Sequence, residues 1–205
     1  RAQIFYADFL AFNGYPLESQ QRLYKSHELH PREITILLHM WNGACVSGMA
    51  APYSLEEIKN MDSLEFYSND INFHLRGLLE NLILGKCSFP SPEVVVAVFD
   101  AVGALPLANY RRATYHVLYS DLFFHYRQLD PALIQLRYAF NIYSDPEILI
   151  RQAMISASAG RNSDALVFLE RARAVDREQV LRLSSHEEEI SRMEFDINNA
   201  LLKNQ

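Results

Sequence analysis

Turn-forming residues are scarce in this chain. Its 205 residues include 7 glycines and 8 prolines, whereas average usage would supply about 14 and about 10. A sandwich or barrel of many short strands needs turn residues at short intervals, so the scarcity argues against both folds. An all-α fold is favoured before any pattern is considered.

Long hydrophobic runs and an excess of positive charge are also missing. The longest stretch without Asp, Glu, Lys or Arg runs from Ile34 to Leu55 and contains His39, Asn42, Ser47 and Pro52. These side chains would cost too much at bilayer depth, so the stretch predicts a buried helix rather than a membrane span. The net charge of −6 argues against nucleic acid as a partner, because nucleic-acid binding needs a basic surface that displaces counterions from phosphates.

Targeting and cofactor motifs are absent as well. The opening residues, RAQIFYADFL, have no basic region and no cleavage site, and they begin in the middle of a helical pattern. We therefore expect a fragment of a longer protein, attached to a membrane only through a missing transmembrane region. The glycines form neither GxGxxG nor a Walker loop, and HExxH, CxxC and GxSxG do not occur. The sequence predicts no cofactor and no metal.

No set of residues has the spacing of a catalytic site. An enzyme site assembled from Tyr119, Asp121 and His125 would lack the spacing of a nucleophile and its base, so we expect no catalytic residue in this domain. The acidic run Glu187–Glu189 is best explained as a solvated helix face.

The two cysteines allow two interpretations. Neither Cys45 nor Cys87 has a cysteine or histidine partner at metal-ligand spacing. They are either two buried free thiols or one disulfide, and a disulfide would imply an oxidising compartment. The two sulfur atoms could meet if the segment between them folds back as a helical hairpin.

Capping signals and apolar periodicity define the helices. Ser54 with Glu57 has the spacing of a capping box, and Pro92, Pro131 and Pro146 stand at first helical positions, where the missing N–H costs nothing. Between these points the apolar residues recur with a helical period. The sequence predicts eleven helices, over 2–13, 17–28, 32–47, 55–61, 70–84, 92–102, 107–127, 131–142, 146–159, 163–175 and 185–203.

A small–large–small spacing recurs in the second helices of three helix pairs. Small residues allow two antiparallel helices to approach closely, and the large residue fills the gap to the next pair. Gly14 and Gly160 lie between paired helices, where a left-handed residue ends the first helix. The recurring positions are Ser19, Leu23 and Ser26; Ala132, Leu136 and Ala139; and Ala165, Leu169 and Ala172.

These residues resemble the tetratricopeptide repeat (TPR), a helix–turn–helix unit of 34 residues. The first unit matches it with Ala7, Gly14, Ser19 and Pro31, and the last unit with Ala153, Gly160, Ala165 and Ala172. The family's early tryptophan is missing, Arg177 replaces the closing proline, and Arg127 stands where a glycine is expected. The resemblance implies a superhelical array of antiparallel hairpins that binds protein or peptide. It divides a single domain, 1–205, into repeat-like units 1–31, 112–145 and 146–177, an irregular helical middle at 48–110 and a capping helix at 185–203.

A narrower resemblance covers more of the chain. The central LRGLLENLILGKC and the later GRNSDALVFLERARAVD are similar to the extramembrane C-terminal domain of bacterial membrane-bound polymerases and oligosaccharide ligases, the class of protein O-glycosylation and O-antigen ligation. This resemblance implies a non-catalytic periplasmic accessory domain of an inner-membrane glycosyltransferase, whose partner would be an acceptor protein. A cytoplasmic TPR-like scaffold or regulator is the alternative.

An aromatic segment, YRRATYHVLYSDLFFHYRQ from Tyr110 to Gln128, invites three interpretations. Its tyrosines and arginines could stack on nucleic-acid bases, but the acidic net charge disfavours that function. Packing of a long central helix accounts for most of the aromatic residues, and the rest suit a groove for a peptide or partner helix. In the repeat geometry, the inner face would present Val117, Asp121, Phe124 and His125 from helix 107–127, and Ile150, Met154 and Ser158 from helix 146–159.

Overall fold

Every element that the structure describes is a helix. The structure is a computed structural model, and it describes residues 2–31, 33–47, 71–87, 92–178 and 186–203. Within these ranges the prediction of an all-α fold is confirmed, and the helix ends lie within three residues of the predicted ones. The predicted helix 55–61 lies outside the described residues. The helices are α1 (Ala2–Phe12), α2 (Pro16–Leu29), α3 (Ile34–Ser47), α5 (Ile71–Ile83), α6 (Pro92–Gly103), α7 (Asn109–His125), α8 (Leu129–Ile142), α9 (Pro146–Ser158), α10 (Asn162–Glu178) and α11 (Glu187–Lys203).

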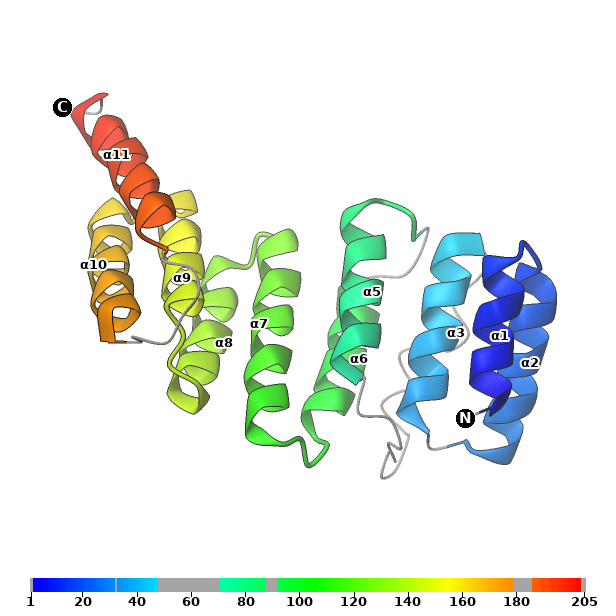
Figure 1. Ribbon diagram of the computed structural model, residues 1–205. Coiled ribbons are helices and arrows are strands. Elements are labelled where there is room, and N and C mark those ends of the chain that lie inside the picture. Colours follow the sequence, from blue (N-terminus) through cyan, green and yellow to red (C-terminus); the bar gives the residue numbers. More distant parts are fainter. Residues whose placement is uncertain (1, 32, 48–70, 88–91, 179–185, 204–205) are drawn as a thin grey trace. The chain divides into compact units, whose positions relative to one another are not determined.

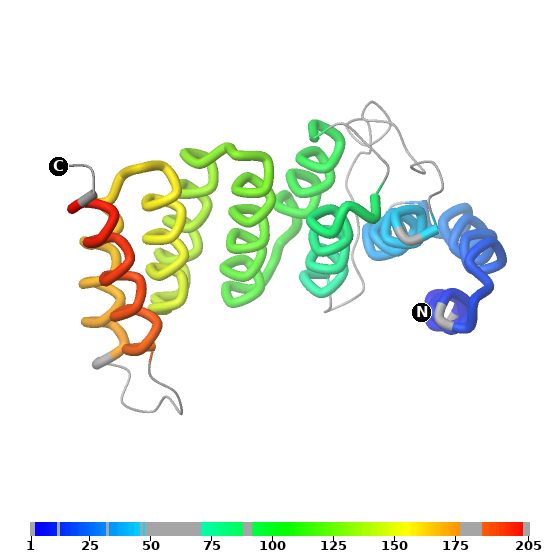
Figure 2. Tube along the Cα trace, turned by 90° about the horizontal axis from the view of Figure 1, so that it is seen from above, coloured from blue at the N-terminus to red at the C-terminus, as the bar shows by residue number. Residues whose placement is uncertain are grey.

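The helices belong to two compact units, Arg1–Leu107 and Ala108–Gln205. In the first unit α1 and α2 form an antiparallel hairpin, α2 packs on α3, and α3 packs on α5 (Figure 1). In the second unit α7 pairs with α8 and α9 pairs with α10, and these pairs lie side by side in both views (Figures 1 and 2). The assignment of 1–205 to one repeat domain, with the unit boundaries given above, stays a prediction.

Gly14 and Gly160, the two predicted helix-ending glycines, have left-handed backbones, and so does Gly85 after α5. The φ angles are +84° at Gly14, +65° at Gly85 and +72° at Gly160. After α1, the amide of Tyr15 donates to the Leu10 carbonyl and the amide of Gly14 donates to the Ala11 carbonyl. This pair of bonds is the Schellman motif, which satisfies carbonyls at a helix end. The same pair of bonds follows α5, α7 and α9.

The turn between α7 and α8 has this geometry without a glycine. Arg127 occupies the left-handed position there, with a φ of +60°. The tertiary packing of α7 on α8 therefore imposes the turn on a residue that does not favour it. A left-handed residue with a Cβ atom costs roughly 1–2 kcal/mol. The α7–α8 hairpin therefore keeps the Schellman turn without a glycine, at the cost of this backbone strain.

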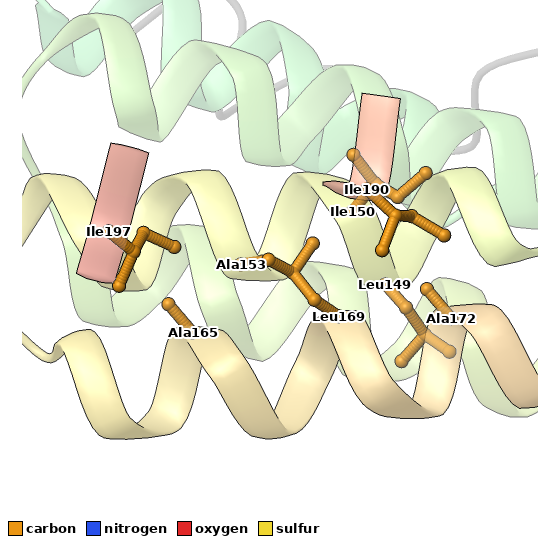
Figure 3. Packing of buried hydrophobic residues seen from close by; sticks show 8 residues of the cluster. All are labelled: Leu149, Ile150, Ala153, Ala165, Leu169, Ala172, Ile190 and Ile197. Carbon is orange, nitrogen blue, oxygen red and sulfur yellow. The ribbon is translucent and has the colours of Figure 1, made fainter. Parts of the chain in front are cut away.

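The small–large–small residues are buried between the paired helices, as predicted. All nine of them are at most 5% exposed. In the second unit, Ala165, Leu169 and Ala172 of α10 face Leu149 and Ala153 of α9 (Figure 3). Because alanine lets two helix backbones approach, these positions fix the crossing of each hairpin.

A disulfide joins α3 to the segment that follows α5. The Sγ atoms of Cys45 and Cys87 are bonded, across a sequence separation of 42. The same two helices are also joined by the amide of Asn42, which donates to the His74 carbonyl. Of the two interpretations that the sequence left open, the structure has the disulfide.

Helices α2 and α3 approach each other closely at Gly43. The side chain of Gln20, on α2, is buried, and its Nε2 donates to the Met40 carbonyl of α3 over 3.2 Å. A Cβ atom at Gly43 would lie 2.0 Å from that Nε2. The glycine therefore makes room for a buried amide that joins the two helices.

None of the described helices is both long enough and apolar enough to cross a membrane.

Candidate functional site

The candidate partner surface lies on α7 and α9, the first helices of the two hairpins of the second unit. On α7, the side chains of Val117, Asp121 and Phe124 are half-buried. On α9, Met154 is 40% exposed, and Ser158 is exposed at the end of the helix. We call these five residues, together with Arg151, the α7–α9 face.

Asp121 and Arg151 tie the two helices together across this face. The Nη1 atom of Arg151 donates to both carboxylate oxygens of Asp121, over 3.0 and 3.1 Å, and its Nη2 donates to Glu147 over 3.2 Å. Burial disfavours the Arg151 cation, but the two carboxylates outweigh it, so its pKa lies above the usual value. The three side chains together have a net charge of −1. Sequence reasoning missed Arg151, although the four-residue spacing from Glu147 to Arg151 is a recognised helix ion pair.

Ile150, another predicted partner residue, is part of the hydrophobic core. It is 4% exposed and clusters with Leu149, Ala153 and Ile190 (Figure 3). Ile190 belongs to α11, which packs on α9 and α10. Ile150 therefore presents no surface to a partner, because α11 contributes a residue to the cluster that buries it.

His125 lies apart from the ion pair, at the C-terminal end of α7. Its side chain is exposed, and its ring centroid is 5.2 Å from that of Tyr126. The residues weighed for an enzyme site have separate surroundings: Tyr119 is buried in a ring stack, Asp121 is paired with Arg151, and His125 is exposed.

Most of the aromatic residues of α7 are used in packing. Tyr115, Tyr119 and Phe123 are buried, with ring centroids 5.7 and 4.5 Å apart along the series. His116 contacts the Gln135 side chain of α8 over 2.7 Å, and burial lowers the pKa of its imidazole. These contacts agree with the packing interpretation of the aromatic segment.

The acidic start of α11 holds that helix against α10. Arg173 of α10 donates to Glu187 over 2.9 Å and 3.1 Å and forms a two-bond pair with Glu194, with 2.9 Å for each bond. The hydrogen bonds to Glu194 are the main cause that raises the pKa of Arg173. Glu187 is therefore not simply part of a solvated face, as the run of charges had indicated, because it takes part in the α10–α11 contact.

Metal ligands are not gathered in the part of the chain that the structure describes. Among those residues, no group of three or more His, Cys, Asp or Glu side chains could hold a metal ion.

Comparisons with known proteins return structures and no sequence relatives. No family model matches the chain, and no curated protein matches it. One similar solved structure is TTC0263, a thermophilic TPR protein of Thermus thermophilus, with a TM-score of 0.46, 17% identity and 98% coverage of both chains. Another is MamA 41-end of Desulfovibrio magneticus, with a TM-score of 0.46, 12% identity and coverage of 87% of this chain and 96% of that one.

The class of the protein follows from its own helix pairs. Antiparallel hairpins with Schellman turns and small buried residues at the helix crossings define an all-α, TPR-like helical-hairpin protein.

Proposed function

We propose that this chain is a non-catalytic domain that binds a protein or peptide through the α7–α9 face. The observation that carries the proposal is the composition of that face. Phe124 and Met154 offer apolar contact area that the core does not use fully, and they lie on the two helices that the Asp121–Arg151 ion pair joins. An amphipathic segment binds to such a surface with apolar anchors and a polar rim.

The charge of the face defines the partner further. Two carboxylates share the one guanidinium of Arg151, and Glu147 is exposed at the edge of the face. A partner segment with an apolar anchor and a nearby lysine or arginine would complement this charge. An acidic segment would be repelled.

The domain's place in the cell is the second part of the proposal. We assign it to the periplasm, as the accessory domain of an inner-membrane glycosyltransferase or oligosaccharide ligase of the O-glycosylation and O-antigen class, where it presents an acceptor protein. The Cys45–Cys87 disulfide supports this location, because structural disulfides persist mainly in oxidising compartments. The resemblance carried by LRGLLENLILGKC supports the role. The alternative, a cytoplasmic scaffold, would keep both thiols reduced.

Site-specific photo-crosslinking tests the partner face. The aromatic crosslinker p-benzoylphenylalanine replaces Phe124 in one variant and Tyr138, an exposed aromatic residue of α8, in the control. We expect a discrete crosslinked partner band from position 124 and none from position 138. Met154→Glu, a change at an exposed position, should weaken the band. Equal bands from positions 124 and 138 would mean that the α7–α9 face is not the binding surface.

Thiol trapping in the native cells tests the location. Acid quenching followed by alkylation under denaturing conditions reports the redox state of Cys45 and Cys87 as a shift in gel mobility. The Cys87→Ser variant shows where the protein without the disulfide runs on the same gel. We expect no free thiol. Two alkylated thiols per chain would favour the cytoplasmic alternative. The gene sequence upstream of Arg1 gives an independent answer, since the proposal requires a polytopic membrane region there.

A further inference from the structure

Helix α1 is apolar on its outer side as well as on its inner side. Ala7 is fully buried, and Ile4 packs against the same core cluster of the first unit. On the outer side, Phe5 is 72% exposed, Tyr6 is 45% exposed and Phe9 is 60% exposed. A helix that is hydrophobic all round is usually a buried helix. The exposed aromatic side chains therefore indicate a surface that another molecule covers.

The first and last helices of the chain differ in the polarity of their outer sides. The one charged residue of α1 is Asp8, whose carboxylate lies 2.9 Å from the Nδ1 atom of His39 on α3. The exposed positions of α11 are mainly charged or polar, and they include Glu188, Arg192 and Asp196. Arrays of helical hairpins need terminal elements with a polar outer side to stay soluble. Helix α11 meets this need, and α1 does not.

The exposed aromatic residues of α1 adjoin charged residues of α2. The Tyr6 and Phe9 rings are stacked, with centroids 6.4 Å apart, and the Cζ atom of Arg22 lies 5.3 Å from the centroid of the Tyr6 ring. Beside them is a hollow of 420 Å³ between α1 and α2, and Glu18 and Lys25 are among the residues that line it. We call Phe5, Tyr6, Phe9, Glu18, Arg22 and Lys25 the α1–α2 face.

We propose that the α1–α2 face binds the same face of a second copy of this chain, around a two-fold axis that crosses both helices at right angles. Such an axis places α1 antiparallel on α1 of the second copy, and α2 antiparallel on α2. An interface of this kind must be self-complementary, so that each residue meets a suitable residue on the other side of the axis. Two pairs of residues on the face meet this condition.

The first pair is apolar and belongs to α1. Phe5 and Phe9 are four residues apart, so they lie on the same side of the helix. An axis level with Ala7, midway between them, places Phe5 of each copy against Phe9 of the other. Contacts between aromatic rings are favourable beyond the area that they bury.

The second pair is charged and belongs to α2. Glu18 and Lys25 are seven residues apart, which is about two turns, so they also share one side of their helix. An axis midway between them places the carboxylate of each copy against the ammonium group of the other. Complementary charges of this kind fix the register of an interface.

The same axis serves both pairs. The contact of Arg22 with Tyr6 places these two residues at one level of the antiparallel hairpin, so Gln21 is level with Ala7. Ala7 is the midpoint of the phenylalanine pair, and Gln21 lies within half a residue of the midpoint of the charged pair. Arg22 is close to the axis, and its guanidinium is held over the Tyr6 ring of its own chain.

The area of the face suits a reversible dimer. With roughly 200 Å² for a whole aromatic side chain, the exposed parts of Phe5, Tyr6 and Phe9 amount to about 350 Å² in each copy. The aromatic residues of two copies thus supply about 700 Å², and the side chains of α2 add to an interface that needs about 1,200 Å² in total. We expect a dissociation constant in the micromolar range.

Sedimentation velocity of the full chain tests the proposal between about 1 and 200 μM. We expect a reversible equilibrium of monomer and dimer. Phe5→Glu should weaken the dimer at least about tenfold. The matched control is Phe73→Glu on α5, because Phe73 is also 72% exposed, and it should leave the dimer unchanged. Neither change removes a buried contact, so circular dichroism should report the same helix content. A monomer at every concentration, or equal weakening by both variants, would overturn the proposal.

A charge exchange tests the two-fold axis itself. Glu18→Lys or Lys25→Glu alone brings like charges together twice in each dimer, so each should weaken it at least about fivefold. The double variant Glu18→Lys/Lys25→Glu restores opposite charges across the axis and should recover the dimer. A double variant that associates no better than the single ones would mean that this axis is wrong.

Flotation with vesicles of phosphatidylcholine and phosphatidylglycerol distinguishes a second copy from a lipid surface. We expect the chain not to float with the vesicles. Flotation that Phe5→Glu abolishes would mean that the face binds lipid, and the proposal would be wrong. None of these variants changes the α7–α9 face, so crosslinking from position 124 should be unaffected, and the dimer can fail independently of the proposed function.

Discussion

Exchanging the residues at two equivalent turns tests how the hairpins are built. Arg127 and Gly160 occupy the same left-handed position in the Schellman motifs that follow α7 and α9. Arg127→Gly removes the strain of a Cβ atom at positive φ, roughly 1–2 kcal/mol. Glycine also gives the unfolded chain more freedom, which costs about 0.4–1 kcal/mol. We therefore expect Arg127→Gly to raise the free energy of unfolding by about 0.5–1 kcal/mol.

Gly160→Arg should have the opposite effect. Nothing lies within 4 Å of a Cβ atom built at Gly160, so the substitution changes backbone strain without a clash. We expect a loss of about 0.5–1 kcal/mol by the same reasoning, and a double variant close to the parent, because the two turns lie in different hairpins. For a unit of about 100 residues, each change corresponds to a shift of about 3–5 °C in the melting temperature.

Urea denaturation followed by circular dichroism measures both effects. The Arg127 side chain is exposed, so its replacement removes no buried contact. A destabilised Arg127→Gly, or a Gly160→Arg with an unchanged midpoint, would mean that the left-handed position does not control the stability of these hairpins.

Three further changes have expected outcomes of known sign. Gly43→Ala should destabilise the fold by about 1 kcal/mol in urea denaturation, because its Cβ atom displaces the Gln20 amide. In the matched control, Gly77→Ala, the new Cβ atom meets its neighbours at 3.6 Å or more, so the denaturation midpoint should stay or rise. Equal midpoints for the two variants would contradict the close approach at Gly43. Burial lowers the pKa of His116 below its ordinary value of 6.5, so the fold loses stability as the pH falls and this imidazole must take up a proton. His116→Gln should therefore reduce the fall in melting temperature between pH 7 and pH 5. An unchanged dependence of the melting temperature on pH would exclude this histidine as a cause. Cys87→Ser opens a loop that the chain-entropy model values at up to about 4 kcal/mol, so the denaturation midpoint should fall well below that of the oxidised parent, and dithiothreitol should reproduce the fall.

The helices and their pairing could be predicted because they depend on local signals. Pro92 and Pro146 mark helix starts at α6 and α9, and the alanines at 165 and 172 mark a close crossing that the structure contains. The turn glycine Gly160 has the expected backbone. Each of these features is decided by residues close together in the sequence, so a periodic pattern is enough to identify it.

The features that the sequence missed, or left open as the disulfide was, depend on distant parts of the chain. Ile150 is placed on the inner face by periodicity, and only the docking of α11 with Ile190 shows that it is buried. Arg151 became part of the site through Asp121, thirty residues earlier. The Cys45–Cys87 bond needs the return of α5 to α3.

The central claim is that a partner binds the α7–α9 face, and crosslinking in the native cells tests it most directly. The full-length protein carries p-benzoylphenylalanine at position 124 or, as the control, at position 138, and the cells are irradiated before lysis. The account predicts a discrete adduct from position 124 that Met154→Glu weakens, and no adduct from position 138. An adduct from both positions, or one that Met154→Glu leaves unchanged, would contradict it.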